Sequence, residues 1–169
     1  MLNKKVEKAL IGQIELEEQS SRIYMAMASW CEVKGFPGAA SFLYKHSDEE
    51  RFHMTKLIKY VNDKGGHAQL HQLAMPKNDY KSLLEIFEEI LKHEQFVTES
   101  INKLYDVAFK EKDFSTGQFL QWYIQEQIEE ESLAKGILDK FRLAGNEKVG
   151  LFHLDKELAG LASTSSQGA

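Results

Sequence analysis

Glutamate and histidine side chains interrupt an otherwise apolar helical pattern at matching places along this chain. Glu50 and His53 form a Glu-x-x-His motif, and a separation of three residues places both side chains on one face of a helix. Glu17, Glu94 and Glu130 stand at corresponding places in other apolar stripes. A carboxylate on the inward face of a helix is costly unless something pairs with it. These residues therefore predict a site where divalent metal ions offset buried negative charge.

The segments that carry these residues show the spacing of bundled helices. Their apolar positions recur in alternating steps of three and four residues, which is the pattern of an inward helical seam. The expected helices span residues 3–33, with Asn3 as N-cap, and then 39–63, 80–110 with Asp79 as a candidate cap, and 116–143. Strand-like alternation is nearly absent. The fold class is therefore predicted to be an all-α four-helix bundle.

The connections define how the four helices are arranged. The first two are joined by a tight turn, whereas residues 67–79 lack periodicity and form an unusually long loop. An extended segment of ~15 residues can span ~50 Å, and a helix of ~25 residues is only ~38 Å long. One long crossover can thus return along the bundle and leave the third helix parallel to the second. Residues 147–161 are expected to form a short fifth helix, which must pack on the bundle or on another subunit. The predicted domain therefore spans residues 1–161. Residues 162–169 are expected to be a frayed tail.

Composition narrows the class of protein. The chain has 169 residues, 43% hydrophobic and 28% charged, with a net charge of −5, which fits one globular domain and argues against nucleic acid as a partner. No apolar run approaches the ~20 residues of a membrane span. Cys31 is the only cysteine and cannot form an intrachain disulfide. Without a leader-like start, a cytoplasmic location is expected.

An internal repeat supports a common layer of polar residues. An offset of 77 residues pairs Glu17 with Glu94, Glu50 with Gln127, and His53 with Glu130. A pseudo-twofold bundle would bring both sets to the same level at its centre. Polar layers also occur merely to fix helix register, but usually as single Asn or Lys residues. Several glutamates in register exceed that role, so a metal site is favoured.

The ligand types indicate which metal chemistry is expected. The four seam glutamates carry four negative charges, which a pair of ferrous ions would neutralise. Oxygen-rich coordination with little imidazole disfavours a structural zinc site, which prefers cysteine and histidine.

Several residues next to the seam allow more than one role. Tyr24 lies two turns beyond Glu17 and is predicted to hydrogen-bond a ligand carboxylate, to donate an electron, or simply to fill the core. Trp122 is more consistent with packing than with redox chemistry, and His46 with a histidine whose hydrogen bonds are satisfied. Glu49, Glu126 and Glu129 flank the seam and are expected to form a third, more open cation site.

At these residues the chain resembles ferritins of the prokaryotic, non-haem type. The resemblance covers roughly residues 1–161 and includes the long crossover; it is carried by Glu17, Tyr24, Glu50-x-x-His53, Glu94 and Gln127-x-x-Glu130. It implies that Glu17, Glu50 and His53 bind one iron ion. The second iron is implied to bind Glu50, Glu94 and Glu130, with Glu50 bridging and Gln127 nearby. The implied third site comprises Glu49, Glu126, Glu129 and Glu130.

Two departures distinguish this chain from related subtypes. Bacterioferritins carry a second Glu-x-x-His, where this chain has Gln127 and Glu130, and a haem-ligating methionine, where it has Arg51. No haem is therefore expected. Rubrerythrin-like proteins need a cysteine-rich iron site, which one cysteine cannot supply.

The resemblance implies iron storage and detoxification by a ferroxidase. Fe(II) would be oxidised to Fe(III) at the dinuclear site by dioxygen or peroxide and mineralised inside a hollow shell. The family assembles as a homo-oligomeric cage of 24 subunits. A short fifth helix that has no core of its own is consistent with such an assembly.

Three alternatives remain open from the residues. A di-iron oxygenase or peroxidase acting on a small molecule would need a pocket beside the metals, against which the bulky Tyr24, Ile101 and Tyr123 argue weakly. A signalling bundle would bind no iron. A mini-ferritin that protects DNA would place its ligands between subunits, whereas all ligands here lie within one chain.

Overall fold

The chain folds into a bundle of four long helices with a shorter fifth helix, which confirms the predicted fold class. The computed structural model describes residues 2–145 and 147–164. Its helices are α1 (Lys4–Val33), α2 (Pro37–Asp63), α3 (Leu83–Lys110), α4 (Phe114–Ala144) and α5 (Lys148–Ser163). None of these helices is both long and apolar enough to cross a membrane.

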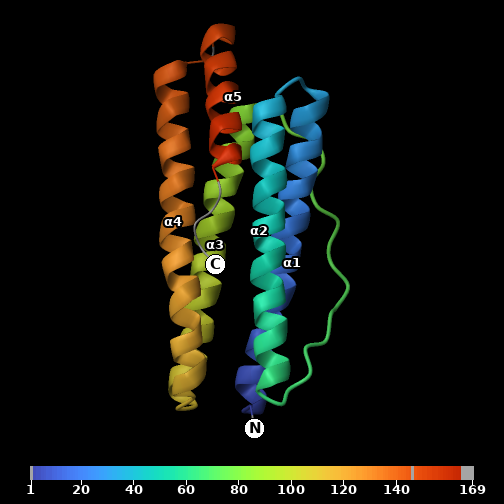
Figure 1. The fold of residues 1–169 in the computed structure, drawn as a ribbon, viewed down its shortest axis with the longest axis vertical. Helices are drawn as coiled ribbons and strands as arrows, with labels where there is room; N and C mark the ends of the chain where they lie inside the picture. The colour runs from blue at the N-terminus through green and yellow to red at the C-terminus, as the bar shows by residue number, and fades with distance from the viewer. Residues whose placement is uncertain (1, 146, 165–169) are drawn as a thin grey trace.

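The direction of the helices follows from the lengths of their connections. Figure 1 shows α1 and α2 side by side and antiparallel, joined by a tight turn. Residues 64–82 then run along the outside of this pair without helical structure. This crossover brings α3 in parallel to α2, as the loop length predicted, and α4 returns antiparallel to α3 (Figure 1).

Some of the observed helix ends agree with the boundaries expected from sequence, and others differ from them. Asn3 caps α1 as predicted, because its side chain accepts a hydrogen bond from Lys5 N. The expectation that the third helix begins at Tyr80 with Asp79 as cap is wrong. Instead Ser82 is the N-cap of α3 and accepts from Glu85 N. The side-chain cap of Ser82 satisfies a backbone donor of the first turn and sets the start of the helix.

Two other helices begin two residues earlier than expected. α2 starts at Pro37, which is well tolerated at a first helical position. α4 starts at Phe114, because Asp113 accepts from Thr116 N and caps it.

Helix α5 packs on the same chain rather than projecting from it. Leu154 and Leu158 are buried, and the Asp155 carboxylate accepts hydrogen bonds from Gly38 N at 3.1 Å and Ala39 N at 2.8 Å. Asp155 thus caps α2, which has no side-chain cap of its own. α5 continues to Ser163, two residues beyond the expected Leu161; most of the predicted tail, 165–169, lies outside the described residues.

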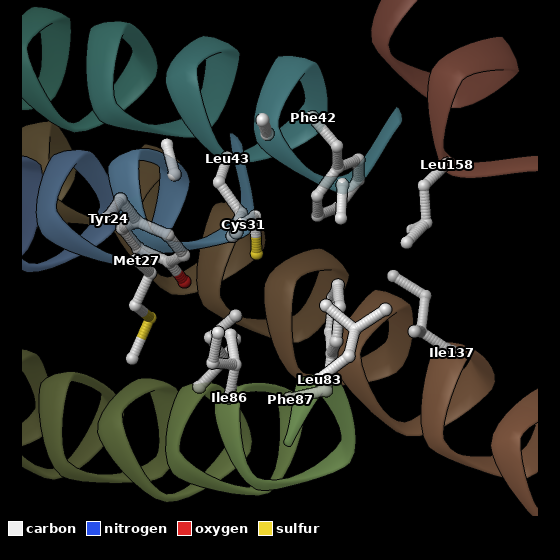
Figure 2. Close-up of a cluster of buried hydrophobic side chains, with 14 of the residues drawn as sticks. Tyr24, Met27, Cys31, Phe42, Leu43, Leu83, Ile86, Phe87, Ile137 and Leu158 are labelled. Atoms are coloured by element: carbon white, nitrogen blue, oxygen red, sulfur yellow. The ribbon is translucent and has the colours of Figure 1, made fainter. Parts of the chain in front are cut away.

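The hydrophobic core is divided into two clusters. One contains Tyr24, Leu43, Phe87 and Ile137 among others, and also receives Leu158 of α5; Figure 2 shows these side chains converging from all five helices. The other contains Leu10, Leu57, Ile101 and Leu120 among others. On each long helix the seam glutamates and their neighbours lie between the two clusters, so the polar layer is enclosed by apolar packing at both ends.

Candidate metal centre

Three predicted ligands from α1 and α2 converge at the centre of the bundle. Glu17, Glu50 and His53 are each at most 4% exposed. Each offers one ligand atom within 4.8 Å of the others. His53 Nδ1 lies 3.5 Å from Glu50 Oε2 and 3.9 Å from Glu17 Oε2. Ligand atoms that share an ion at bond lengths of about 2.0–2.2 Å are separated by about 3–4 Å, so this geometry suits a metal ion.

Two carboxylate oxygens in this group have no hydrogen-bond partner among the described residues. They are Glu17 Oε2 and Glu50 Oε2, and both are fully enclosed. Buried polar atoms are nearly always paired, and both of these atoms lie near His53 Nδ1. The polar layer therefore lacks a positively charged partner for these two oxygens. A divalent cation beside His53 Nδ1 would supply one.

A hydrogen-bonded chain holds Glu17 so that one oxygen is free. Gln13 Nε2 donates to Glu17 Oε1 at 2.8 Å, and Ser100 Oγ of α3 donates to Gln13 Oε1 at 2.7 Å. The sequence reasoning missed both residues. Gln13 stands one turn before Glu17 on the same helix, which was an available signal. Ser100 carries no such signal, because its partner is on another helix.

Glu94 of α3 is held by two residues from other helices. The Tyr24 hydroxyl donates to Glu94 Oε1. Gln127 Nε2 donates to Glu94 Oε2 at 3.0 Å and to the backbone oxygen of Glu94 at 3.2 Å. Of the roles considered for Tyr24, the structure shows a hydrogen bond to a carboxylate, that of Glu94.

Burial makes the charged forms of the central carboxylates costly. It raises the pKa of Glu17 well above the usual range, and the nearby Glu50 adds to this. The pKa of Glu50 is likewise raised well above its usual range by burial and by Glu94. Burial, together with Glu130, raises the pKa of Glu94 to about 7. Metal binding therefore competes with protons in this layer.

Glu130 of α4 lies next to His46, which the sequence analysis interpreted as a histidine whose hydrogen bonds are satisfied. Its Oε2 lies 3.5 Å from His46 Nε2. Burial alone would raise the pKa of Glu130, but the neighbouring His46 imidazole holds it below the usual range. His46, Glu49 and Glu130 form a second group with ligand atoms within 4.8 Å of one another. The available signal was the position of His46 one turn before Glu50.

A cavity of about 780 Å³ opens beside this group between α2 and α4. All four glutamates expected to form a third cation site line it, namely Glu49, Glu126, Glu129 and Glu130, together with His46 and His53. The bulky seam neighbours had argued weakly against a pocket. None of these three residues, Tyr24, Ile101 and Tyr123, lines this cavity. Its four glutamates suit a cation, while Phe52, Trp122 and Leu133 make part of its wall apolar.

Two further side chains surround the centre. His93, for which no partner was predicted, is half-buried with Nε2 2.7 Å from Ser20 Oγ, and the loss of solvent around the ring lowers its pKa to about 4. Trp122 packs edge-on against the His53 ring at 5.1 Å, and the Lys56 ammonium lies 3.5 Å from the Trp122 ring centroid. Packing against a ligand imidazole is in line with the structural role expected for Trp122.

The fold and this centre together define an all-helical bundle with a buried carboxylate–histidine layer. A family model described as a ferritin-like domain matches residues 7–144. A bacterial non-heme ferritin of Campylobacter jejuni is 43% identical over 162 residues, covering 96% of this chain and 97% of that protein. A bacterial non-heme ferritin of Escherichia coli O6:H1 is 44% identical over 161 residues, covering 95% and 98%. The chain belongs to the ferritin family.

A solved structure agrees with this assignment. An open pore ferritin from the hyperthermophilic archaeon Archaeoglobus fulgidus superimposes with a TM-score of 0.92 at 38% identity. The match covers 94% of this chain and 98% of that chain. The non-haem ferritin resemblance inferred from the seam residues is therefore confirmed at the level of the family.

Proposed function

We propose that this protein stores and detoxifies iron by oxidising Fe(II) at a dinuclear site within each subunit. The observation that carries the proposal is the pair of unpartnered oxygens, Glu17 Oε2 and Glu50 Oε2, enclosed in the bundle beside His53 Nδ1. The ferritin relatives support iron as the ion. Iron is substrate and cargo here, not a resident group.

Each residue of the layer has a distinct part in this function. Glu17, Glu50 and His53 hold the first ferrous ion. Glu50, Glu94 and Glu130 hold the second, with Glu50 between the two and Gln127 beside Glu94. Tyr24 orients Glu94. Glu49, Glu126, Glu129 and Glu130 line the acidic cavity and form the third site, through which a cation reaches or leaves the pair.

The redox balance is simple. Two ferrous ions give up one electron each, and dioxygen takes both electrons with two protons to form hydrogen peroxide. Peroxide itself can take two electrons and two protons to form water. Anionic oxygen ligands stabilise the higher charge of Fe(III), so oxidation is favoured at this layer. The ferric product hydrolyses and mineralises in the interior of a 24-subunit cage in the cytoplasm. No haem takes part.

The decisive experiment is an anaerobic Fe(II) titration followed by oxygen, with the assembly mass measured by light scattering. We expect about two to three Fe(II) per chain, oxygen-dependent ferric colour and a large shell. Glu17→Gln should lose one Fe(II) per chain and slow oxidation at least 10-fold. Glu18→Gln, the neighbouring carboxylate, should match the wild type. A monomer or dimer that turns over a small organic substrate would refute the proposal in favour of a di-iron oxygenase.

A further inference from the structure

The group formed by His46, Glu49 and Glu130 has the geometry of a cation site with a nitrogen ligand. His46 Nε2 and Glu130 Oε2 are 3.5 Å apart, which is longer than a good hydrogen bond. Two ligand atoms at about 2.1 Å from one ion in tetrahedral geometry lie about 3.4 Å apart. The spacing thus matches an ion between the two atoms better than a direct contact.

The backbone fixes which imidazole nitrogen is available. His46 Nδ1 lies 3.1 Å from the carbonyl oxygen of Phe42. A carbonyl can only accept, so Nδ1 carries the proton and donates it. The lone pair of a neutral ring is then on Nε2, which faces Glu130. A ligand histidine usually donates its other N–H to a backbone carbonyl or carboxylate in this way.

The surroundings leave room for an ion. The His46 side chain is only 8% exposed, and within the described chain its one hydrogen bond is the Nδ1 bond to Phe42. Nε2 therefore makes no hydrogen bond there and faces the Glu130 carboxylate at 3.5 Å, while Glu49 Oε2 lies 3.7 Å from Nδ1 on the other side of the ring. The cavity of about 780 Å³ borders all three residues. It gives a cation access without opening the apolar clusters.

We propose that His46 is a ligand of the third cation site, with Glu49 and Glu130. This rests on the proposed function and deepens it. An imidazole among the ligands selects divalent transition metals such as Fe(II) or Zn(II) over Mg(II) and Ca(II), which take oxygen ligands. The site thus holds iron before oxidation. Glu130 is shared with the dinuclear pair, so an ion can pass between the two sites by a turn of one carboxylate.

The test uses the assembled protein, with Zn(II) alone as an oxygen-inert probe. Binding stoichiometry is measured by calorimetry in the presence of excess Mg(II). We expect about three Zn(II) per chain in the wild type, and one fewer in both His46→Gln and Glu49→Gln. His71→Gln, which changes an exposed histidine, serves as the matched control and should retain all sites. Glu49→Gln keeps the test valid if His46→Gln misfolds, because Glu49 is partly exposed.

A second readout identifies the nitrogen directly. In a His53→Gln background, zinc K-edge absorption should still show imidazole scattering, and the added His46→Gln change should remove it. Unchanged stoichiometry and scattering in the His46 variant would overturn the proposal and leave His46 as an ion-pair partner of Glu130. Loss of a site in His46→Gln with none lost in Glu17→Gln would instead count against the dinuclear centre. The two failures are therefore distinguishable.

Discussion

The hydroxyl of Tyr24 on α1 donates a hydrogen bond to Glu94 on α3, linking a core aromatic residue to a carboxylate of the candidate metal centre. The tyrosine ring belongs to one of the two apolar clusters, so its position is fixed by packing. Its hydroxyl in turn fixes one oxygen of Glu94. The geometry of the polar layer is thus set by the apolar cluster next to it.

Removing this hydroxyl should misplace Glu94 without emptying the site. We expect Tyr24→Phe to slow Fe(II) oxidation about 10-fold, because an outer partner of a metal ligand has been lost. Stopped-flow absorbance after mixing with oxygen measures this. Tyr44→Phe, which changes an exposed tyrosine bonded to Glu32, should leave the rate unaltered. An equal loss in both variants would mean that Tyr24 has no specific role.

In the proposed dinuclear centre, the uncharged Gln127 would limit the negative charge around the second iron. It donates to Glu94 at 3.0 Å, and Gln127→Glu would replace this donor with a repelling carboxylate. We expect the added charge to hold ferric product longer, so that a second addition of Fe(II) is oxidised several-fold more slowly than the first. Gln121→Glu, on the exposed side of α4, is the control. Equal first and second additions in Gln127→Glu would contradict this account.

The stability of the metal-free protein should fall as the pH rises toward and through neutrality. Burial raises the pKa of Glu94 from 4.5 to about 7. A raised pKa in the folded state gives stability that is complete below about 4.5 and is lost as the pH rises through about 7. Zn(II) replaces the proton, so its stabilising effect should increase over the same range. Thermal midpoints with and without Zn(II) at pH 5 and pH 8 measure both trends; a zinc effect independent of pH would contradict them.

Contact between α5 and the start of α2 leaves no space at Gly38. A Cβ there would lie 1.9 Å from the backbone oxygen of Asp155. We expect Gly38→Ala to displace α5 and destabilise the fold by about 1–3 kcal/mol. Gly136→Ala is the matched control, because nothing lies within 4 Å of its Cβ and alanine should stabilise a helix by up to about 1 kcal/mol. Thermal unfolding at one protein concentration compares them, and a neutral Gly38→Ala would show that α5 packs elsewhere.

The sequence by itself determined the bundle and the level of its polar layer. Helical periodicity is local, so the apolar steps around Glu17, Glu50 and Glu94 indicated the inward face of each helix. The loop expected at 67–79 was long enough for a crossover along the bundle. Helix ends were less predictable, because Ser82 and Asp79 are equally good caps in isolation and neighbouring packing decides between them.

The tertiary structure alone decided which side chains meet across helices. The hydrogen bond from Ser100 to Gln13, the cap that Asp155 provides for α2 and the approach of Glu130 to His46 all join residues far apart in sequence. No spacing rule encodes them, since each depends on the rotation and height of one helix against another. Those two parameters are set by how the apolar clusters pack.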